Sequence, residues 1–201
     1  MISRTLVLEE ERVRLEPLAQ IHAEQLRAIG NDPALWEHTF QLSPFVSIES
    51  THAWIDSAIA EPNQVAFAIV DKESGVAVGS TRYVDIQPQF RKLEIGWTFL
   101  ARTAWRTHIN TTCKFLLLQH AFERAHCVRV QLKAEALNVR SRAAMQRMGA
   151  HYEGTLRNFR IRPSDGRVCD VAFYSVIDAE WPTIRDRLRS PFLVGIGASD
   201  G

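Results

Sequence analysis

Polar and basic side chains gather where a predicted strand gives way to a long predicted helix, in residues 93–123 of the 201-residue chain. The backbone N–H groups at the start of a helix have no partner within it, and the helix dipole adds positive potential there. The segment therefore predicts a site for an anion. The alternative is that one polar residue only caps the helix while the arginines form a solvated face. The residues concerned are Arg102, Arg106, Asn110, Thr111 and Lys114.

A second segment, residues 133–154, has a related pattern. Asn138 stands at a predicted helix start, Ser141 follows three residues later, and Gly149 lies where a helix C-cap glycine belongs. The amide and the hydroxyl could bind a ligand at this helix start. The alternative is that Asn138 is an N-cap without a ligand. Neither segment decides the function by itself.

The rest of the chain supplies the elements that would hold these segments in place. Hairpin connections predict antiparallel strands, and the strand–helix–strand connection from 90 to 134 predicts a right-handed parallel crossover. The result is an α+β fold with a central, mixed, mostly antiparallel twisted sheet of about seven strands flanked by helices. Strands are predicted at 5–15 (around an acidic turn), 65–71, 76–86, 90–100, 128–134, 151–157 and 168–176, and helices at 18–29, 50–60, 110–125, 138–148 and 179–188.

The composition limits the classes of protein to which the chain can belong. No linker or repeat interrupts the chain, so we expect one domain over 1–201, with a core at about 10–185 and a tail at 189–201. The 24 Lys and Arg against 23 Asp and Glu give a net charge of +1, which argues against a nucleic-acid partner. No apolar run approaches the roughly 18 residues of a membrane span.

Cysteine and histidine usage points to a cytoplasmic protein without a metal. Cys113, Cys127 and Cys169 are scattered and are predicted to be reduced, buried thiols. The seven histidines form no HxxH or HExxH pattern, so no metal is expected. A GxSxG motif is also missing from the sequence, which argues against a serine hydrolase.

Together, the two segments resemble the GNAT superfamily of acyl-CoA N-acetyltransferases. The resemblance lies in Glu-Ile-Gly-Trp at 94–97, Asn-x-x-Ser at 138–141 and Met-Gly-Ala at 148–150, and it covers roughly residues 10–185. Within the superfamily, the sequence is most similar to the RimJ/RimL-like group, which includes ribosomal-protein N-terminal acetyltransferases. The resemblance implies a GNAT-type domain whose sheet is splayed between its fourth and fifth strands.

The resemblance also implies acetyl-CoA as the acyl donor. Asn138 matches the family asparagine that hydrogen-bonds pantetheine, and Ser141 would lie toward the thioester sulfur. The end of the fourth strand would pair with pantetheine amides through Thr98, Phe99 and Leu100. The pyrophosphate would be bound by the loop and helix start that contain Arg102, Arg106, Thr107, His108, Ile109, Asn110 and Thr111. The sequence departs from the family in one respect, because Arg106 and His108 stand where the family often has glycines.

Acetyl transfer to an amine needs a base for the amine proton and donors for the developing negative charge. Glu94 is the candidate base, because related enzymes have a glutamate in the same Glu-Ile-Gly-aromatic context. Gly96 beside it could form a bulge that opens the sheet. The alternative is a surface glutamate paired with Arg82 or Lys92. Strand alternation predicts that Glu94 faces away from Leu93, Ile95, Trp97 and Phe99.

For the departing thiolate, the sequence leaves two alternatives. Many family members use a tyrosine four residues after the Ser141 position, where this chain has Met145. Ser141 is then the remaining catalytic candidate, as a hydrogen-bond donor to the sulfur. Alternatively, CoA thiolate leaves without a general acid. A backbone N–H near Leu100 would polarise the thioester carbonyl.

Acceptor recognition is expected from residues 34–48 and from the loop at 157–168. The arginines of that loop form either a solvated hairpin or a site for an acidic or phosphate-bearing acceptor. The residues proposed to contact the acceptor are Trp36, Phe45, Arg82, Tyr83 and Arg160.

The expected function is an N-acetyltransferase acting on a primary amine of a protein N-terminus, an amino acid or a small molecule. The alternative is a catalytically silent acyl-CoA-binding or sensing module on the same fold. The apolar tail with Phe192, Leu193, Val194 and Ile196 could pack on a second copy of the chain, as a homodimer, or on its own sheet.

Overall fold

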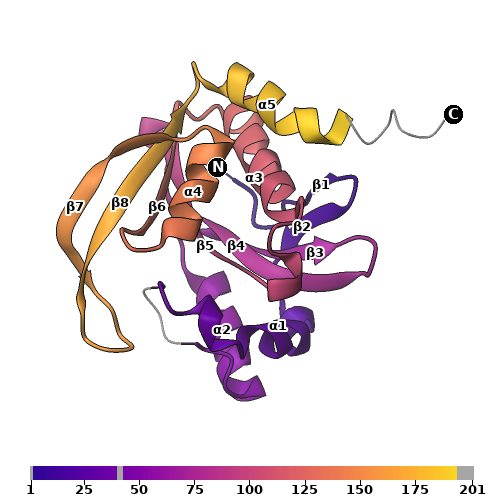
Figure 1. Cartoon of the computed structure of the whole chain (residues 1–201). Coiled ribbons are helices and arrows are strands. Elements are labelled where there is room, and N and C mark those ends of the chain that lie inside the picture. The colour runs from indigo at the N-terminus through magenta and orange to yellow at the C-terminus, as the bar shows by residue number, and fades with distance from the viewer. Residues whose placement is uncertain (1, 40–42, 194–201) are drawn as a thin grey trace, which may run out of the picture.

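The computed structural model describes residues 2–39 and 43–193 (Figure 1). One sheet with the strand order β1-β2-β3-β4-β5-β6-β8-β7 runs through the molecule, and only β5 and β6 pair in parallel. The predicted α+β architecture is confirmed. The strands are β1 Leu8–Glu10, β2 Val13–Pro17, β3 Val65–Asp71, β4 Val76–Gln87, β5 Lys92–Leu100, β6 Arg129–Glu135, β7 His151–Ile161 and β8 Val168–Ile177.

The sheet has eight strands because the first predicted strand is a hairpin. Its acidic turn separates β1 from β2, which pair antiparallel from Leu8 with Leu15 to Glu10 with Val13. The fourth and fifth predicted strands are therefore β5 and β6. Strand β7 also runs to Ile161, farther than the pattern predicts, because it stays paired with β8 through a register shift between Leu156 and Arg160.

Five α-helices accompany the strands in the described part of the chain, with short 3₁₀ turns between them. Helix α2 begins at Ile48 rather than Ser50, because Ser47 caps it and accepts a hydrogen bond from Ser50 N at 3.1 Å. Helix α5 extends to Leu193, so it includes part of the predicted tail; Val194 and Ile196 lie outside the described residues. The helices are α1 Ala23–Gly30, α2 Ile48–Ala60, α3 Ile109–Gln119, α4 Val139–Met148 and α5 Trp181–Leu193.

Two apolar cores cover the two faces of the sheet. Alternation along β3 sends Phe67 and Ile69 to a large core that includes α3, while Ala68 and Val70 face a smaller core beneath α1 and α2. Cys113, Cys127 and Cys169 are buried and free. No helix in the described ranges is long and apolar enough to cross a bilayer.

Candidate active site

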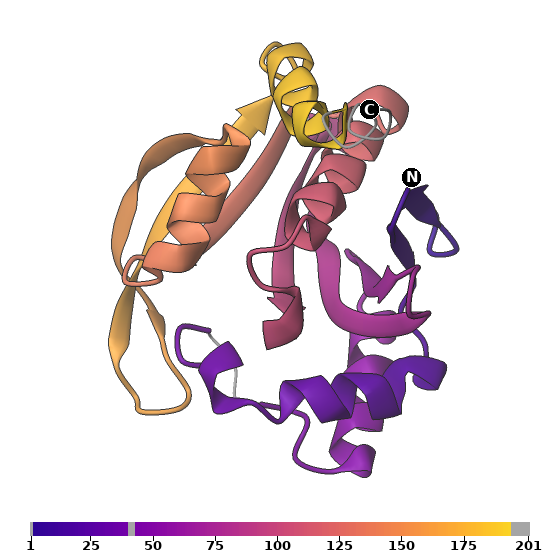
Figure 2. The same ribbon diagram turned by 45° about the vertical axis from the view of Figure 1, so that its right-hand side comes forward.

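Strands β5 and β6 separate partway along their length. Their parallel pairing joins Lys92 to Arg129, Leu93 to Val130 and Glu94 to Gln131, and it ends there. Beyond Glu94 the edge of β5 has no neighbouring strand among the described residues, and the two halves of the sheet diverge (Figure 2). Glu94 is thus the last paired residue before the separation. The backbone of β5 that follows it is not paired with β6, and at its end the Leu100 carbonyl accepts a hydrogen bond from Trp105 Nε1 at 2.9 Å.

The Glu94 side chain is buried, with 4% of its surface exposed. Its Oε2 accepts hydrogen bonds from Gln131 Nε2 at 2.9 Å and from Lys133 Nζ at 2.8 Å, both on β6. A Cβ at Gly96 would lie 3.1 Å from Oε1, so the missing side chain leaves space beside that oxygen. Glu94 is therefore paired with Lys133, and not with Arg82 or Lys92 as the alternative from the sequence had it.

A β-bulge follows Glu94. The register with β4 shifts between the pairs of Ser80 and Arg82, and Trp97 adopts a positive φ of 54°. The shift turns Trp97 and Phe99 toward α2, where Trp97 lies over Arg82. The expectation that both aromatics face away from Glu94 is wrong, because the extra residue of a bulge reverses the alternation after it.

Three residues expected to recognise an acceptor belong to the core instead. Phe45 is 1% and Trp36 7% exposed, and their rings pack against Phe99 at centroid distances of 5.3 and 5.4 Å. Tyr83 is fully buried on the α3 side and donates a hydrogen bond to Leu117 O. These side chains fill space under the helices and present no surface to a ligand. Arg160 is exposed on β7.

The start of α3 lacks a side-chain cap from its N-cap residue, although one of its backbone donors is already used. Its N-cap is His108, which makes no side-chain cap, so Asn110 and Thr111 lie inside the first turn and do not cap the helix. Thr107 Oγ1 accepts a hydrogen bond from Ile109 N at 3.3 Å. Arg106 has a φ of +61°, the left-handed conformation that glycine adopts most readily. The loop thus reaches a glycine-like conformation without a glycine.

Two arginines near the starts of α3 and α4 lie over the same tryptophan ring. Arg140, in the first turn of α4, lies 3.6 Å over the ring of Trp105, and Arg102 lies over the same ring at 5.5 Å. Burial and the charge of Arg102 lower the pKa of Arg140, because both disfavour its charged form. We call the starts of α3 and α4, with these two arginines, the helix-start region. Arg102 is also paired with Asp32 at 3.3 Å, so the positive potential that suits an anion comes mainly from Arg140 and the helix start.

Lys114 does not join that region. Its ammonium group donates to Thr98 Oγ1 at 2.8 Å, and burial lowers its pKa. Thr98 in turn hydrogen-bonds Thr81 at 2.8 Å, so this polar group lies against the sheet.

Asn138 is the N-cap of α4, and its Oδ1 accepts a hydrogen bond from Ser141 N at 3.0 Å. The side-chain amide nitrogen is not used in this cap. Asn138 and Ser141 both lie at the start of α4, close in sequence to Arg140, as the pattern predicts. Met145, one turn farther along, is buried in the larger core and 6% exposed, so it offers no polar group.

Sequence reasoning missed a second buried carboxylate. Glu135, at the end of β6, is 1% exposed and pairs with Arg167 and, at 3.9 Å, with Arg162. Arg162 also hydrogen-bonds Asp165 and the Glu37 carbonyl, so the basic hairpin is not simply solvated. The missed signal is strand alternation, which places Gln131, Lys133 and Glu135 on one face of β6. We call this face, with Glu94, the Glu94 face.

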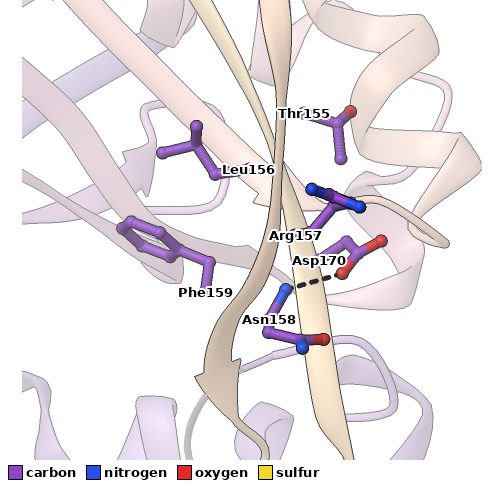
Figure 3. A pocket seen from close by; sticks show the side chains of 6 residues that line it. All are labelled: Thr155, Leu156, Arg157, Asn158, Phe159 and Asp170. Carbon is purple, nitrogen blue, oxygen red and sulfur yellow. Dashed lines mark hydrogen bonds between the residues drawn. The ribbon is translucent and has the colours of Figure 1, made fainter.

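An open hollow of about 910 Å³ lies on the hairpin formed by β7 and β8 (Figure 3). The register shift of β7 forms it, and Asn158 N donates to Asp170 Oδ1 at 2.8 Å beneath it. None of the residues predicted for catalysis or acyl-donor binding lines it. The lining residues are Thr155, Leu156, Arg157, Asn158, Phe159 and Asp170.

Within the described residues, no three His, Cys, Asp or Glu side chains gather in a way that could hold a metal ion.

Comparison with known proteins identifies the fold. Residues 12–151 match the model of the acetyltransferase (GNAT) domain. The chain is 23% identical over 177 residues to an uncharacterized N-acetyltransferase p20 of Bacillus licheniformis, covering 87% of this chain and 97% of that protein.

Two solved structures extend the comparison. A GCN5-related N-acetyltransferase from Brucella melitensis superposes with a TM-score of 0.87 at 28% identity, over 92% of this chain and 85% of that one. RimJ of Mycobacterium smegmatis, in complex with CoA-disulfide, shares the fold with a TM-score of 0.81 at 20% identity, over 94% and 95%. The resemblance seen in the sequence is confirmed: the chain belongs to the GNAT acetyltransferase family.

Proposed function

We propose that this protein transfers an acetyl group from acetyl-CoA to a primary amine, with Glu94 as the base. The observation that carries the proposal is the position of Glu94. A buried carboxylate, with one oxygen bound to Gln131 and Lys133, lies where β5 and β6 separate. The family supports acetyl transfer, and the neighbouring RimJ structure contains a CoA derivative.

The residues of the helix-start region fit the anionic part of acetyl-CoA. The start of α3 has no side-chain cap, and Arg102 and Arg140 lie together on Trp105. Backbone N–H groups between Thr107 and Thr111 would bind the pyrophosphate, as a helix N-terminus does, except Ile109 N, which donates to Thr107 Oγ1. The edge of β5 at Thr98, Phe99 and Leu100 would pair with amides of pantetheine, although the Leu100 carbonyl already accepts a hydrogen bond from Trp105 Nε1 at 2.9 Å. The amide nitrogen of Asn138 would donate to the same arm.

The chemistry then follows from the side chains. Glu94 Oε1 takes the proton of the acceptor amine, directly or through a water molecule, while Lys133 holds Oε2. The amine nitrogen forms a bond to the thioester carbonyl carbon, and the carbon–sulfur bond breaks. A backbone N–H near Leu100 stabilises the negative charge on the carbonyl oxygen. The Ser141 hydroxyl donates to the departing sulfur.

One observation favours a second candidate, an acyl-CoA-binding module without turnover. Met145 occupies the position where many relatives have a tyrosine acid, and it is buried in the core. Such a module would use the helix-start region and leave Glu94 unused.

The test combines binding with turnover. We expect calorimetry to show micromolar acetyl-CoA binding, and Asn138→Ser to weaken it about tenfold. Serine caps a helix about as well as asparagine, so the variant removes the amide without unfolding α4.

Acceptors are then screened by thiol release with a panel of amines. No binding at millimolar acetyl-CoA would overturn both candidates, whereas tight binding with no turnover for any amine would favour the binding module.

A further inference from the structure

A buried arginine on the face of Glu94 has no anionic partner in the described structure. Arg82 on β4 is 4% exposed, and its guanidinium lies between two indole rings, 4.7 Å from Trp54 and 4.3 Å from Trp97. Its single hydrogen bond, from Nη1 to Gln64 Oε1, is long at 3.4 Å. The Nε atom is buried with no partner. An unpaired buried charge is costly to a folded protein, so its presence calls for a function.

A second unpartnered donor lies beside it. The indole Nε1 of Trp54, on α2, is also buried without a hydrogen bond. Most buried polar groups in proteins are hydrogen-bonded, and two orphaned donors in contact with each other are exceptional. Both are N–H groups, and one carries a positive charge. An oxygen anion that accepted a hydrogen bond from each of them would satisfy both.

The geometry connects this pair with the candidate base. Arg82 is paired with Gly96 across β4 and β5, and directly paired residues point to the same face. The missing Gly96 side chain would contact Glu94 Oε1, so Arg82 and the Glu94 carboxylate share that face. Gly96 is two residues from Glu94, about 7 Å along the strand. One small molecule can therefore reach both groups.

We propose that Arg82 and Trp54 bind the carboxylate of an acceptor that carries its amine close to that carboxylate, as an α-amino acid does. The inference rests on the proposed function, because Glu94 must deprotonate the amine of the same molecule. The site offers one cation and one neutral donor, which match a single-charged carboxylate better than a phosphate dianion. Trp97, 45% exposed on the bulge, covers the guanidinium on one side, so the ligand would have to enter past this ring.

The test uses matched acceptors: free L-amino acids and their α-amides, which differ only in the carboxylate. We expect the wild type to prefer the acids by at least tenfold in kcat/KM. Arg82→Met should abolish that preference and leave the KM for acetyl-CoA unchanged. Trp54→Phe, which keeps the ring and removes the N–H, should reduce the preference severalfold. Arg27→Met, at an exposed arginine paired with Glu24 on α1, is the matched control and should change nothing.

The melting temperature tests this inference independently of the proposed function. Arg82→Met removes an unpaired buried charge, so the free protein should be at least as stable as the wild type. If the wild type acetylates no amine, the proposed function fails. The anion site is then judged by whether millimolar amino acid raises the Tm of the wild type but not that of Arg82→Met.

Three results would overturn the inference. The first is equal turnover of acids and amides by the wild type. The second is a preference that survives Arg82→Met, or survives Arg82→Lys together with Trp54→Phe if the methionine variant does not fold. The third is stronger selection for phosphoethanolamine over ethanolamine than for acids over amides, which would assign the site to phosphate.

Discussion

The helix-start region and the Glu94 face both combine elements from the two sides of the separation between β5 and β6, yet they offer different kinds of groups. In the helix-start region, the binding groups are mainly backbone N–H groups at the start of α3, and the unpaired edge of β5 adds further backbone groups beside it. On the Glu94 face they are buried side chains that depend on one another, such as Glu94 with Lys133 and Glu135 with Arg167. A site built from backbone should tolerate side-chain substitutions that a site built from buried charges should not.

The largest effect is expected for Glu94→Gln. The change keeps the shape and the contact with Gln131 but removes the proton acceptor. We expect kcat/KM for amine acetylation to fall by about 10²–10³, the usual contribution of a general base, with acetyl-CoA affinity unchanged. Steady-state kinetics and calorimetry measure the two quantities. Glu49→Gln, at an exposed glutamate of α2, is the control. Retention of more than half the turnover would exclude Glu94 as the base.

A smaller effect is expected in the helix-start region. Arg140→Ala or Arg102→Ala should each raise the Kd for acetyl-CoA about tenfold or less, because the backbone donors remain. The loss should shrink at high salt, since these arginines are partly exposed and their charges are screened. Titrations at two salt concentrations measure it. A loss above a hundredfold from either variant alone would show that side chains carry this region too, and the contrast between the regions would disappear.

These differences explain what could be predicted from the sequence. The starts of α3 and α4, with Asn138 and Ser141, follow from local patterns that do not depend on distant residues, whereas the open edge of β5 is implied only by the resemblance to the GNAT superfamily. The bulge at Trp97 does not follow from local patterns: one extra residue sends Trp97 and Phe99 to the other face, and single-strand alternation cannot detect it. Glu94 is hydrogen-bonded by residues of β6 that lie 37 and 39 positions later in the sequence. Glu135 is paired with Arg167, in the loop between β7 and β8. Burial of Trp36 and Phe45 likewise depends on Phe99 after the bulge.

Arg106→Gly tests whether the backbone itself is under strain. Arg106 has a φ of +61°, which costs a non-glycine residue about 1–2 kcal/mol and glycine almost nothing. After the entropy that glycine loses on folding, we expect a gain of about 1 kcal/mol in the free energy of unfolding, or a Tm higher by about 2–4 °C. Acetyl-CoA affinity should change by less than threefold. A variant that is less stable than the wild type would show that the Arg106 side chain, and not the loop conformation, holds this turn.

The smallest effect concerns the pair of Glu153 and Arg129, which belongs to neither region. Glu153 on β7 accepts hydrogen bonds from both terminal nitrogens of Arg129 and from Ser175 Oγ, and the bonds from Arg129 are the main reason its pKa falls to about 2. Because the folded-state pKa lies below the ordinary value of 4.5, the pair stabilises the fold fully above pH 4.5, and this stability is lost as the pH falls toward 2.

Glu153→Gln should therefore lower the free energy of unfolding at pH 7 by about 1 kcal/mol, a modest figure because a partly exposed pair is screened by solvent. At pH 2, the folded-state pKa, most of this difference should be gone in urea unfolding. A difference that is as large at pH 2 as at pH 7 would mean that the loss comes from altered contacts and not from the carboxylate charge. If the difference shrinks as expected, a fall in acetylation between pH 7 and 4.5 cannot come from this pair. It must then be sought among the groups that contact the substrates, Glu94 first.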